Sequence, residues 1–352
     1  MNRSLVQRFG LSLPLIQAPM AGVAPPALVA AACNAGALGF LAVGAMDAGG
    51  ARQAIEQTRA LTDRPFGVNV FCHAPAQADP ARDARWLQYL QPQFEKFGAA
   101  PPAALREIYG TFVTDSAMLD VLVQARPAAV GFHFGLPGAD RIAALKEAGI
   151  LLMASATSTS EALAIEAAGV DVIVAQGIEA GGHRGVFDPR APDAQLETLA
   201  LVREIREQVA LPIVAAGGIM DGRDIAAALA AGAELAQMGT AFVGCPESSA
   251  DAAYRSALAR PDVRTVLTSA ISGRPARGIA NVLTALGEAP DRPPIPDYPT
   301  AYDAGKALHA AAKAGGSADY AAQWAGRNAA RARALPAAEL IAQLKQELEA
   351  AA

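Results

Sequence analysis

The stretch VIVAQGIEAGGHRGVFDPRAP, residues 172–192, joins a run of branched apolar residues to a glycine-rich loop. The run ends at Gln176 and is typical of a buried strand, and the loop that follows carries His183, one of only four histidines. Loops that follow buried parallel strands are where α/β proteins place reactive groups. The stretch therefore predicts an α/β fold with a functional loop at His183.

The same alternation of short apolar runs and longer alanine-rich stretches extends from Leu15 to Met238 and predicts eight βα units. The expected strands cover residues 14–18, 38–43, 66–70, 129–134, 151–155, 171–176, 212–217 and 234–239. Eight units in roughly 230 residues match a (β/α)8 TIM barrel in size. Spacing alone does not show closure, so a doubly wound open sheet is the alternative.

Two segments depart from this alternation. Residues 72–114, after the third strand, are too long for a plain βα connection and contain a helix flanked by prolines, so they predict an insertion over the barrel mouth. Beyond Met238 the pattern ends, and we expect a mostly helical C-terminal extension. We thus divide the chain into a barrel, residues 1–245, and a helical extension that caps the substrate pocket, residues 246–352.

The composition of the chain disfavours some classes of function. The chain has 352 residues, of which 52% are apolar and 18% charged, with a net charge of -5 and no basic cluster, which disfavours a nucleic-acid partner. No apolar run is long enough to span a membrane, and no signal peptide is recognised, so we expect a cytoplasmic protein with a small-molecule partner. Three cysteines without a CxxC pair predict neither disulfides nor a metal site.

Glycines follow the last two predicted strands, at Gly217 and Gly218 and at Gly239 before Thr240. Glycines just before a helix let a phosphate approach backbone N–H groups, and the helix dipole favours its charge. Such paired loops form the phosphate site of many barrels, although glycines also simply make turns. The pair predicts a phosphate-bearing ligand.

Two amide side chains, Asn69 and Gln176, end the third and sixth strands, and residues 18–21 after the first strand offer backbone groups. Amides can recognise both the carbonyls and the nitrogens of a flat heterocycle. Amides across the mouth from a phosphate site suggest flavin mononucleotide (FMN), whereas either amide alone is more often a plain cap.

Five motifs occur in order: PLIQAPMAG (14–22), FGVNVF (66–71), QGIEAGGHRG (176–185), AAGGI (215–219) and QMGTAF (237–242). Together they resemble the motifs of the FMN-dependent nitronate monooxygenases, formerly called 2-nitropropane dioxygenases. The resemblance resumes in PDYPTAYDAGKAL, residues 296–308. It implies a TIM barrel that holds FMN noncovalently and uses O₂ to oxidise alkyl nitronates, such as propionate 3-nitronate, to carbonyl compounds with nitrite or nitrate.

The resemblance also assigns residues. Expected FMN contacts are Ala18, Pro19, Met20, Asn69, Gln176, Gly181, Gly182, Gly217, Gly218, Gln237, Met238, Gly239 and Thr240. The implied catalytic base is His183, and Tyr109, Tyr298, Tyr302 and Lys306 would face the substrate. One departure is Arg327, where many relatives have glutamine after WAG, which puts a flavin contact from this position in doubt.

The histidine of the quoted loop suits this chemistry, because an imidazole with an ordinary pKa near 6.5 can accept a proton or stabilise an anion at neutral pH. His133 ends the fourth strand and could line the pocket or simply pack. For His73 we expect a structural or surface role, and His309 carries no signal.

Two other function classes stay open. An NAD(P)H-dependent flavin reductase, of the quinone or enoyl-acyl-carrier reductase type, could use the same barrel and loop. A phosphate-binding barrel without redox chemistry, or a flavin-binding protein without activity, would also fit the glycine loops. A homodimer is compatible with the sequence.

Overall fold

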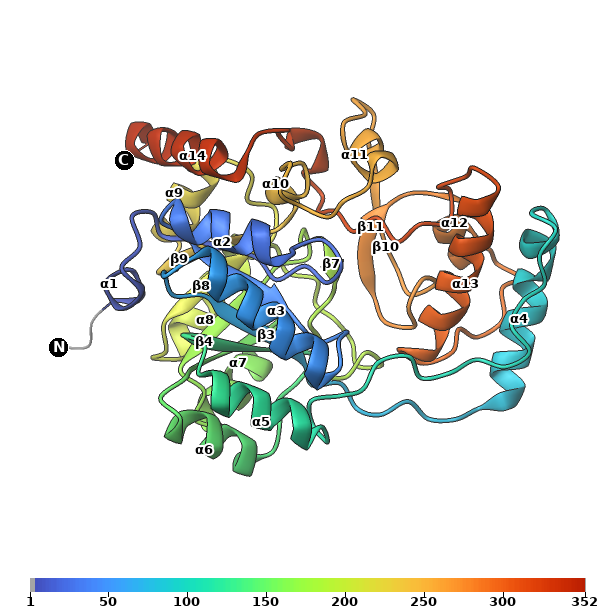
Figure 1. The fold of residues 1–352 in the computed structure, drawn as a ribbon, viewed down its shortest axis with the longest axis horizontal. Helices are drawn as coiled ribbons and strands as arrows, with labels where there is room; N and C mark the ends of the chain where they lie inside the picture. The colour runs from blue at the N-terminus through green and yellow to red at the C-terminus, as the bar shows by residue number, and fades with distance from the viewer. Residues whose placement is uncertain (1–3, 352) are drawn as a thin grey trace.

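The computed structural model describes residues 4–351 and contains, within them, a closed barrel of eight parallel strands in the order β1-β2-β3-β4-β5-β6-β8-β9 (Figure 1). The barrel strands are β1 (Leu15–Gln17), β2 (Leu38–Ala42), β3 (Gly67–Phe71), β4 (Ala129–His133), β5 (Leu151–Ala156), β6 (Val172–Gln176), β8 (Ile213–Ala216) and β9 (Leu235–Met238). β9 pairs back onto β1, with Ile16 opposite Gln237. This closure confirms the TIM barrel and excludes the open sheet.

Helices cover the outside of the barrel. They are α2 (Pro26–Asn34), α3 (Ala48–Leu61), α5 (Ser116–Ala125), α6 (Ala139–Glu147), α7 (Thr159–Ala167), α8 (Thr198–Gln208) and α9 (Gly222–Ala230). A further helix, α1 (Leu5–Phe9), packs through Leu5 and Phe9 against the residues inside the barrel. Polar side chains fix the starts of several of the outer helices. Asp47, Asp115 and Ser158 each accept a hydrogen bond from a backbone N–H in the first turn of the helix that follows.

The strands are buried on both faces, which explains their continuous apolar runs. Inside the barrel, Ile16, Leu38, Phe40 and Met153 pack together, and on the outside the strands pack against the helices. Burial of each such large side chain stabilises the fold by ~1.5–3 kcal/mol. The barrel is therefore a rigid base for the loops at its carboxyl end.

The insertion and the tail form a second layer beside the barrel mouth, on the right in Figure 1. The insertion contains α4 (Pro80–Glu95), whose Trp86 and Leu90 pack with Leu308 of α13 (Thr300–Ala314). The other elements of the tail, residues 246–352, are α11 (Ala252–Leu258), β10 (Thr265–Thr268), β11 (Ala276–Ile279), α12 (Val282–Glu288), η1 (Ala329–Arg331) and α14 (Ala337–Ala351). The short helix α10 (Thr240–Val243) follows β9 and still belongs to the barrel.

The tail is less uniformly helical than the sequence led us to expect. Its strands β10 and β11 form an antiparallel sheet with β7 (Gly182–His183), which is part of the loop after β6. The last helix, α14, leaves this layer and packs against α9 and α2 on the barrel (Figure 1). The tail thus contacts the barrel both at the mouth and along its outer wall.

Among the helices of residues 4–351, none combines the length and the apolar character that a bilayer span requires.

Candidate active site

A cavity of about 800 Å³ lies at the carboxyl ends of the barrel strands, between the barrel and the tail. Its size falls in the range of pockets that bind cofactors and drug-sized molecules. The predicted contacts that line it are Ala18, Pro19, Met20, Asn69, Tyr109, His133, Gln176, Gly181, Gly182, His183, Gly217, Gly218, Gln237, Gly239, Thr240, Tyr298, Tyr302 and Lys306. The fold thus brings together at one cavity residues from six barrel strands, the insertion and the tail.

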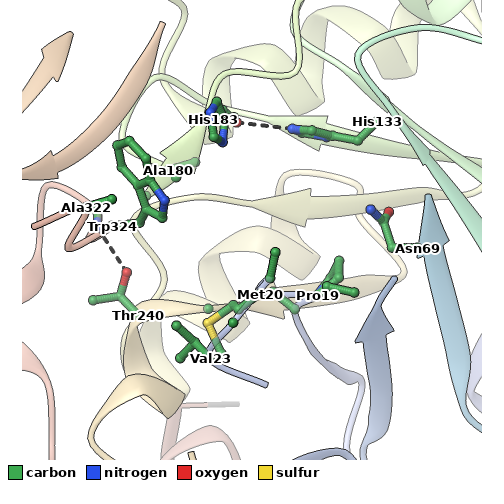
Figure 2. Close-up of a pocket in the computed structure, with 18 of the residues that line it drawn as sticks. Pro19, Met20, Val23, Asn69, His133, Ala180, His183, Thr240, Ala322 and Trp324 are labelled. Atoms are coloured by element: carbon green, nitrogen blue, oxygen red, sulfur yellow. Dashed lines mark hydrogen bonds between the residues drawn. The ribbon is translucent and has the colours of Figure 1, made fainter. Parts of the chain in front are cut away.

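The barrel side of the cavity consists mainly of backbone and small side chains. Figure 2 shows Pro19 and Met20 on one side of the cavity, Asn69 at one end, and His183 opposite them. Gly131 and Ala216 also line the cavity. A surface with few protruding side chains leaves room for a broad flat molecule, which fits the ring of a flavin.

The glycine loop after β8 has the backbone freedom that the phosphate prediction requires. Gly217 and Gly218 have φ values of +119° and +72°, which other residues adopt at a cost. The loop is fixed from the tail, because the Asn328 side chain donates a hydrogen bond of 2.7 Å to the carbonyl oxygen of Gly218. These residues fit a phosphate-bearing ligand.

The N-terminus of α9, by contrast, is already occupied, so the helix-dipole part of that prediction is wrong for the loop after β8. Asp221 accepts hydrogen bonds of 3.0 Å from the N–H groups of Arg223 and Asp224, and Gly222 donates one of 2.9 Å to Glu347. The first-turn donors of α9 are therefore satisfied within the protein, and a phosphate would depend on the glycine loops instead.

His183 lies on the tail side of the cavity. Its strand β7 pairs with β11, and its Nε2 is 2.8 Å from the hydroxyl oxygen of Ser272. Its ring meets the rings of Tyr298 and Trp324 at centroid distances of 5.4 and 5.0 Å. Both the sheet pairing and the aromatic packing hold the imidazole in one place.

The expected pKa of His183 is wrong. Burial, together with the nearby charges of His133 and Arg274, lowers the pKa of His183 from its usual 6.5 to about 3. Its imidazole is therefore neutral at pH 7. A negatively charged ligand beside the ring would raise this pKa again, because it favours the protonated form.

His133 and Gln176 hold the loop that carries His183. The His183 carbonyl oxygen is 3.1 Å from His133 Nε2 and accepts a bond of 3.0 Å from Gln176. Because a carbonyl only accepts, Nε2 of His133 carries the proton, and Nδ1 accepts from Ser155, 2.9 Å away. Gln176 also accepts from the N–H of Gly185 at 2.7 Å. Both side chains position the loop, whichever ligand binds.

Three residues at the tail end of the cavity form a mixed aromatic and cationic group. Lys306 Nζ is 5.1 Å from the ring centre of Tyr109 and 5.4 Å from that of Tyr302. Burial raises the pKa of each tyrosine to about 12, so both phenols stay protonated and can donate hydrogen bonds. Donors and a cation at one place suit an anionic substrate.

Comparison with known proteins agrees with this geometry. The family model described as nitronate monooxygenase matches residues 2–347. The chain belongs to the nitronate monooxygenase family. It is 62% identical over 349 residues to a nitronate monooxygenase of Paraburkholderia phytofirmans, which covers 99% of this chain and 95% of the relative. A nitronate monooxygenase of Pseudomonas aeruginosa is 56% identical, with 99% of both chains covered.

Solved structures give the same result. A nitroalkane oxidase from Streptomyces ansochromogenes superposes with a TM-score of 0.89 at 42% identity, over 97% of each chain. FabK from Thermotoga maritima has a TM-score of 0.76 at 27% identity, over 99% of this chain and 97% of its own. The chain is thus an oxidoreductase of a flavin-dependent family of TIM barrels.

Two residues singled out in the sequence lie away from the cavity of this family member. The side chain of Met238 is buried in the barrel core and does not line the cavity. The side chain of Arg327 is exposed and forms an ion pair of 3.0 Å with Glu197. Its backbone N–H donates to Glu179, so the position contributes through its main chain.

Several cavity residues were missed or misjudged from sequence. Trp324 and Tyr254 gave no signal there, and His309 lines the cavity although no role was expected. Ser272, which does not line the cavity but contacts His183, was missed as well. His73 is fully buried against Tyr298, so the surface role expected as one option is wrong. All except His73 come from the tail, whose path over the barrel depends on contacts between distant segments.

No group of three or more metal-binding side chains occurs within residues 4–351.

Proposed function

We propose that the chain uses FMN and O₂ to oxidise alkyl nitronates, such as propionate 3-nitronate, to carbonyl compounds with nitrite or nitrate. The observation that carries this proposal is the position of His183, which lies at the cavity with Nε2 on Ser272 and faces a barrel side of backbone and small side chains. Family membership supports the reaction class.

We propose FMN as the flavin, held by the barrel, residues 1–245, while the tail caps the substrate end. The glycine loops at 217–218 and 239–240 would hold its phosphate, and Asn69 and the 18–20 backbone would contact its ring. FMN supplies the electron-accepting chemistry that no side chain provides. The protein's own residues then have to bind, orient and exchange a proton.

We assign the proton to His183, as catalytic base. In the free site its imidazole is neutral, because burial lowers its pKa to about 3. As a base, the neutral imidazole would take the proton from the carbon of a neutral nitroalkane and leave the nitronate, whose negative charge raises the pKa of the protonated ring. An anion is therefore the ligand to which this histidine responds.

The tail residues would bind the rest of the substrate. Tyr302 and Tyr109 offer phenol protons, and Lys306 offers a positive charge suited to a carboxylate or nitronate oxygen. Aromatic rings around His183, among them Trp324, keep bulk water from the reacting atoms. Together they favour small anions.

Two mixing experiments with the purified flavoprotein test the proposal. We expect O₂ consumption with propionate 3-nitronate in air, and bleaching of the flavin absorbance by the nitronate without O₂. Rapid anaerobic bleaching by NADH with no reaction of the nitronate would contradict the proposal and favour the flavin reductase. A colourless protein would contradict flavin binding altogether. The homodimer stays a prediction, tested by molar mass in solution.

A further inference from the structure

Arg274 is a deeply buried arginine without a carboxylate partner. It is 4% exposed, and its Nη2 donates to the carbonyl oxygens of Val186 and Phe187, the latter at 3.3 Å. Its buried Nε has no hydrogen-bond partner. Within residues 4–351, no carboxylate forms an ion pair with its guanidinium. A charge taken out of water without a counter-charge is costly, so its retention needs a reason.

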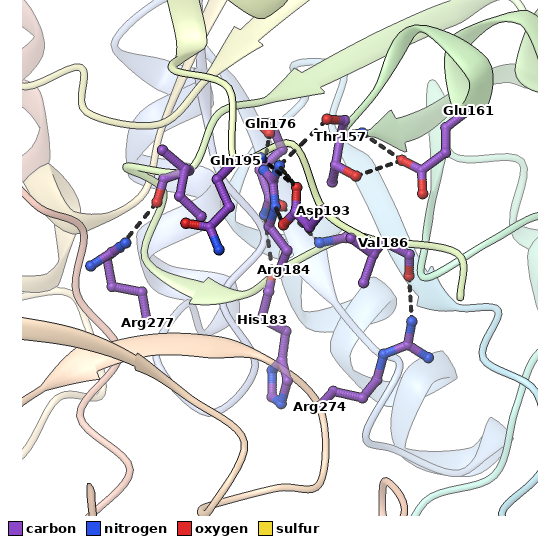
Figure 3. A network of polar contacts seen from close by, with 12 residues as sticks. Thr157, Glu161, Gln176, His183, Arg184, Val186, Asp193, Gln195, Arg274 and Arg277 are labelled. Carbon is purple, nitrogen blue, oxygen red and sulfur yellow. Dashed lines mark hydrogen bonds and ion pairs between the residues drawn. The ribbon is translucent and has the colours of Figure 1, made fainter. Parts of the chain in front are cut away.

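A second arginine of the same region shows the usual arrangement. Arg184 follows His183 directly and is also buried, but its Nε and Nη2 both donate to Asp193, at 2.8 and 2.9 Å. Figure 3 shows Arg184 beside Asp193, and Arg274 at a distance from both. The fold therefore neutralises one buried arginine and leaves the other unpaired.

The unpaired charge lies one aromatic ring behind the cavity. The guanidinium carbon of Arg274 is 4.4 Å from the ring centre of Phe134. The same ring meets the rings of His183 and Tyr298, both of which line the cavity, at centroid distances of 5.5 and 5.4 Å. Phe134 has a φ of +75°, which is strained for a bulky residue, so packing holds this ring in place.

The positive charge of Arg274 changes the pKa values of side chains at and near the cavity wall. Arg274 contributes to lowering the pKa values of His183, His133 and His73, and it also acts to lower that of Tyr298. Burial lowers its own pKa only to about 10, so it stays charged at neutral pH.

Other charges face the same region from neighbouring elements. Asp188 and Glu161 raise the pKa of Arg274, but neither pairs with it, and Glu161 is held by Thr157 and the Phe187 N–H. Arg184, on the other side, is paired with Asp193. Neither Asp188 nor Glu161 forms an ion pair with Arg274, so its charge behind Phe134 is only partly offset.

We propose that Arg274 is a specificity-determining residue, whose unpaired charge behind Phe134 favours a small anion in the cavity over a neutral molecule of the same shape. This inference rests on the function proposed above, since the anion there is the nitronate. Arg274 touches neither substrate nor cofactor and acts through the electric field at the cavity wall.

The test compares two probes of similar size on the flavin-loaded protein: nitrate, a planar anion, and nitroethane, a neutral nitro compound. Dissociation constants are measured from the change in flavin absorbance for the wild type and for R274K, R274Q and R274M. We expect R274Q and R274M to bind nitrate about tenfold more weakly and nitroethane almost unchanged, while R274K keeps nitrate binding within about threefold. The exposed arginine variant R260M serves as the control.

A second readout does not need a ligand. Histidine resonances in NMR titrations should show a higher pKa for His133 or His183 in R274Q than in R274K, because the positive charge that opposes protonation is gone. A purely structural role of Arg274 would not produce this difference.

Three results would overturn the inference. The first is that the wild-type protein binds nitrate no more tightly than nitroethane. This comparison does not depend on whether any variant folds. The second is equal weakening of both probes in R274Q, and the third is R274K behaving like R274M. Failure of the proposed function is seen separately, as absent O₂ consumption with the nitronate, and leaves the ratio of the two probes measurable.

Discussion

The two sides of the cavity are built from different chemistry. The barrel side offers backbone, glycines and an amide, as in Pro19, Asn69 and Gly218, whereas the tail side offers aromatic rings and ionisable groups, as in Tyr302 and Lys306. The first side suits a large flat molecule that is held by shape and hydrogen bonds. The second suits a small charged one.

This difference shows that separate parts of the fold would hold the large flat molecule and the small charged one. Rigid parallel strands position the barrel side, while the tail side depends on a peripheral sheet and on α13. His183 connects the two, because its loop leaves a barrel strand and pairs with β11 of the tail. Substitutions on the two sides of the cavity should therefore change different quantities, namely flavin binding on the barrel side and substrate turnover on the tail side.

The largest effect is expected at the connecting residue. Under the proposed function, His183→Ala removes the imidazole assigned to stabilise the bound anion, so nitronate turnover should fall by ~10²–10⁴-fold, while the flavin should stay bound to the barrel side. Oxygen consumption and the flavin spectrum measure the two quantities. Arg260→Ala, at an exposed ion pair with Asp262, is the control and should keep full activity. Comparable turnover in both variants would remove His183 from the mechanism.

The second-largest effect is expected for a substitution at the contact between the barrel side and the tail side. A methyl group on Gly181 would lie 2.5 Å from the backbone nitrogen of Gly326 and 2.6 Å from the carbonyl carbon of Ala325. Backbone cannot rotate away, so Gly181→Ala should destabilise the protein by ~1–3 kcal/mol and loosen flavin retention.

The matched control is Gly110→Ala, since a methyl group there meets nothing within 4 Å. Urea unfolding and flavin loss on dialysis measure the outcome. Equal stability of the two variants would show that the tail moves aside freely.

The histidines near the tail side predict how stability depends on pH. Burial lowers the pKa values of His73 and His133 to about 4 and that of His183 to about 3, whereas all three are near 6.5 in the unfolded chain. Below pH 6.5 the unfolded chain binds more protons, so folding stability is complete above that pH and falls towards pH 4. The loss is at most ~1.4 kcal/mol per pH unit for each histidine.

His73→Phe should reduce this slope, because His73 is buried with both ring nitrogens unpartnered and contributes one of the three protons. Denaturant unfolding at pH 5 and pH 7.5 gives the comparison. A steeper slope in the variant would be the contrary result.

The smallest effect is expected for a substitution at the protein surface, away from both sides of the cavity. Arg327 and Glu197 form an exposed ion pair, with side chains 47% and 68% accessible. Arg327→Gln should change the unfolding free energy by less than ~0.5 kcal/mol and leave the flavin spectrum and turnover unchanged. A loss of bound flavin would show that this position contacts the cofactor after all.

The barrel side could be predicted from sequence because its signals are local. Each strand is a short run of branched residues, and predicted site residues such as Asn69 and Gln176 lie at or near the end of such a run. Once the eight runs are aligned, the rule that strand ends converge places these residues together. The cavity lining agrees with that placement.

The tail side could not be predicted in the same way. The pairing of β11 with β7 joins residues about ninety positions apart, and neither strand is long enough to show a period. Ser272 and Arg274 therefore gave no signal, although they flank the glycine of a turn between β10 and β11. Even for His183, the sequence indicated the residue but not its neutral state, because burial is a property of the assembled fold.

Helix α14 has a consequence for how ligands enter. The tail leaves the barrel after β9, crosses the mouth, and is fastened again where Glu347 binds Gly222 and Arg333 and where α14 lies on α9 and α2. Because the tail is attached to the barrel at both ends, it cannot open as a hinged lid unless α14 dissociates from α9 and α2. We therefore expect ligands to enter and leave through rearrangements of side chains at the rim, which should favour compact molecules over bulky ones.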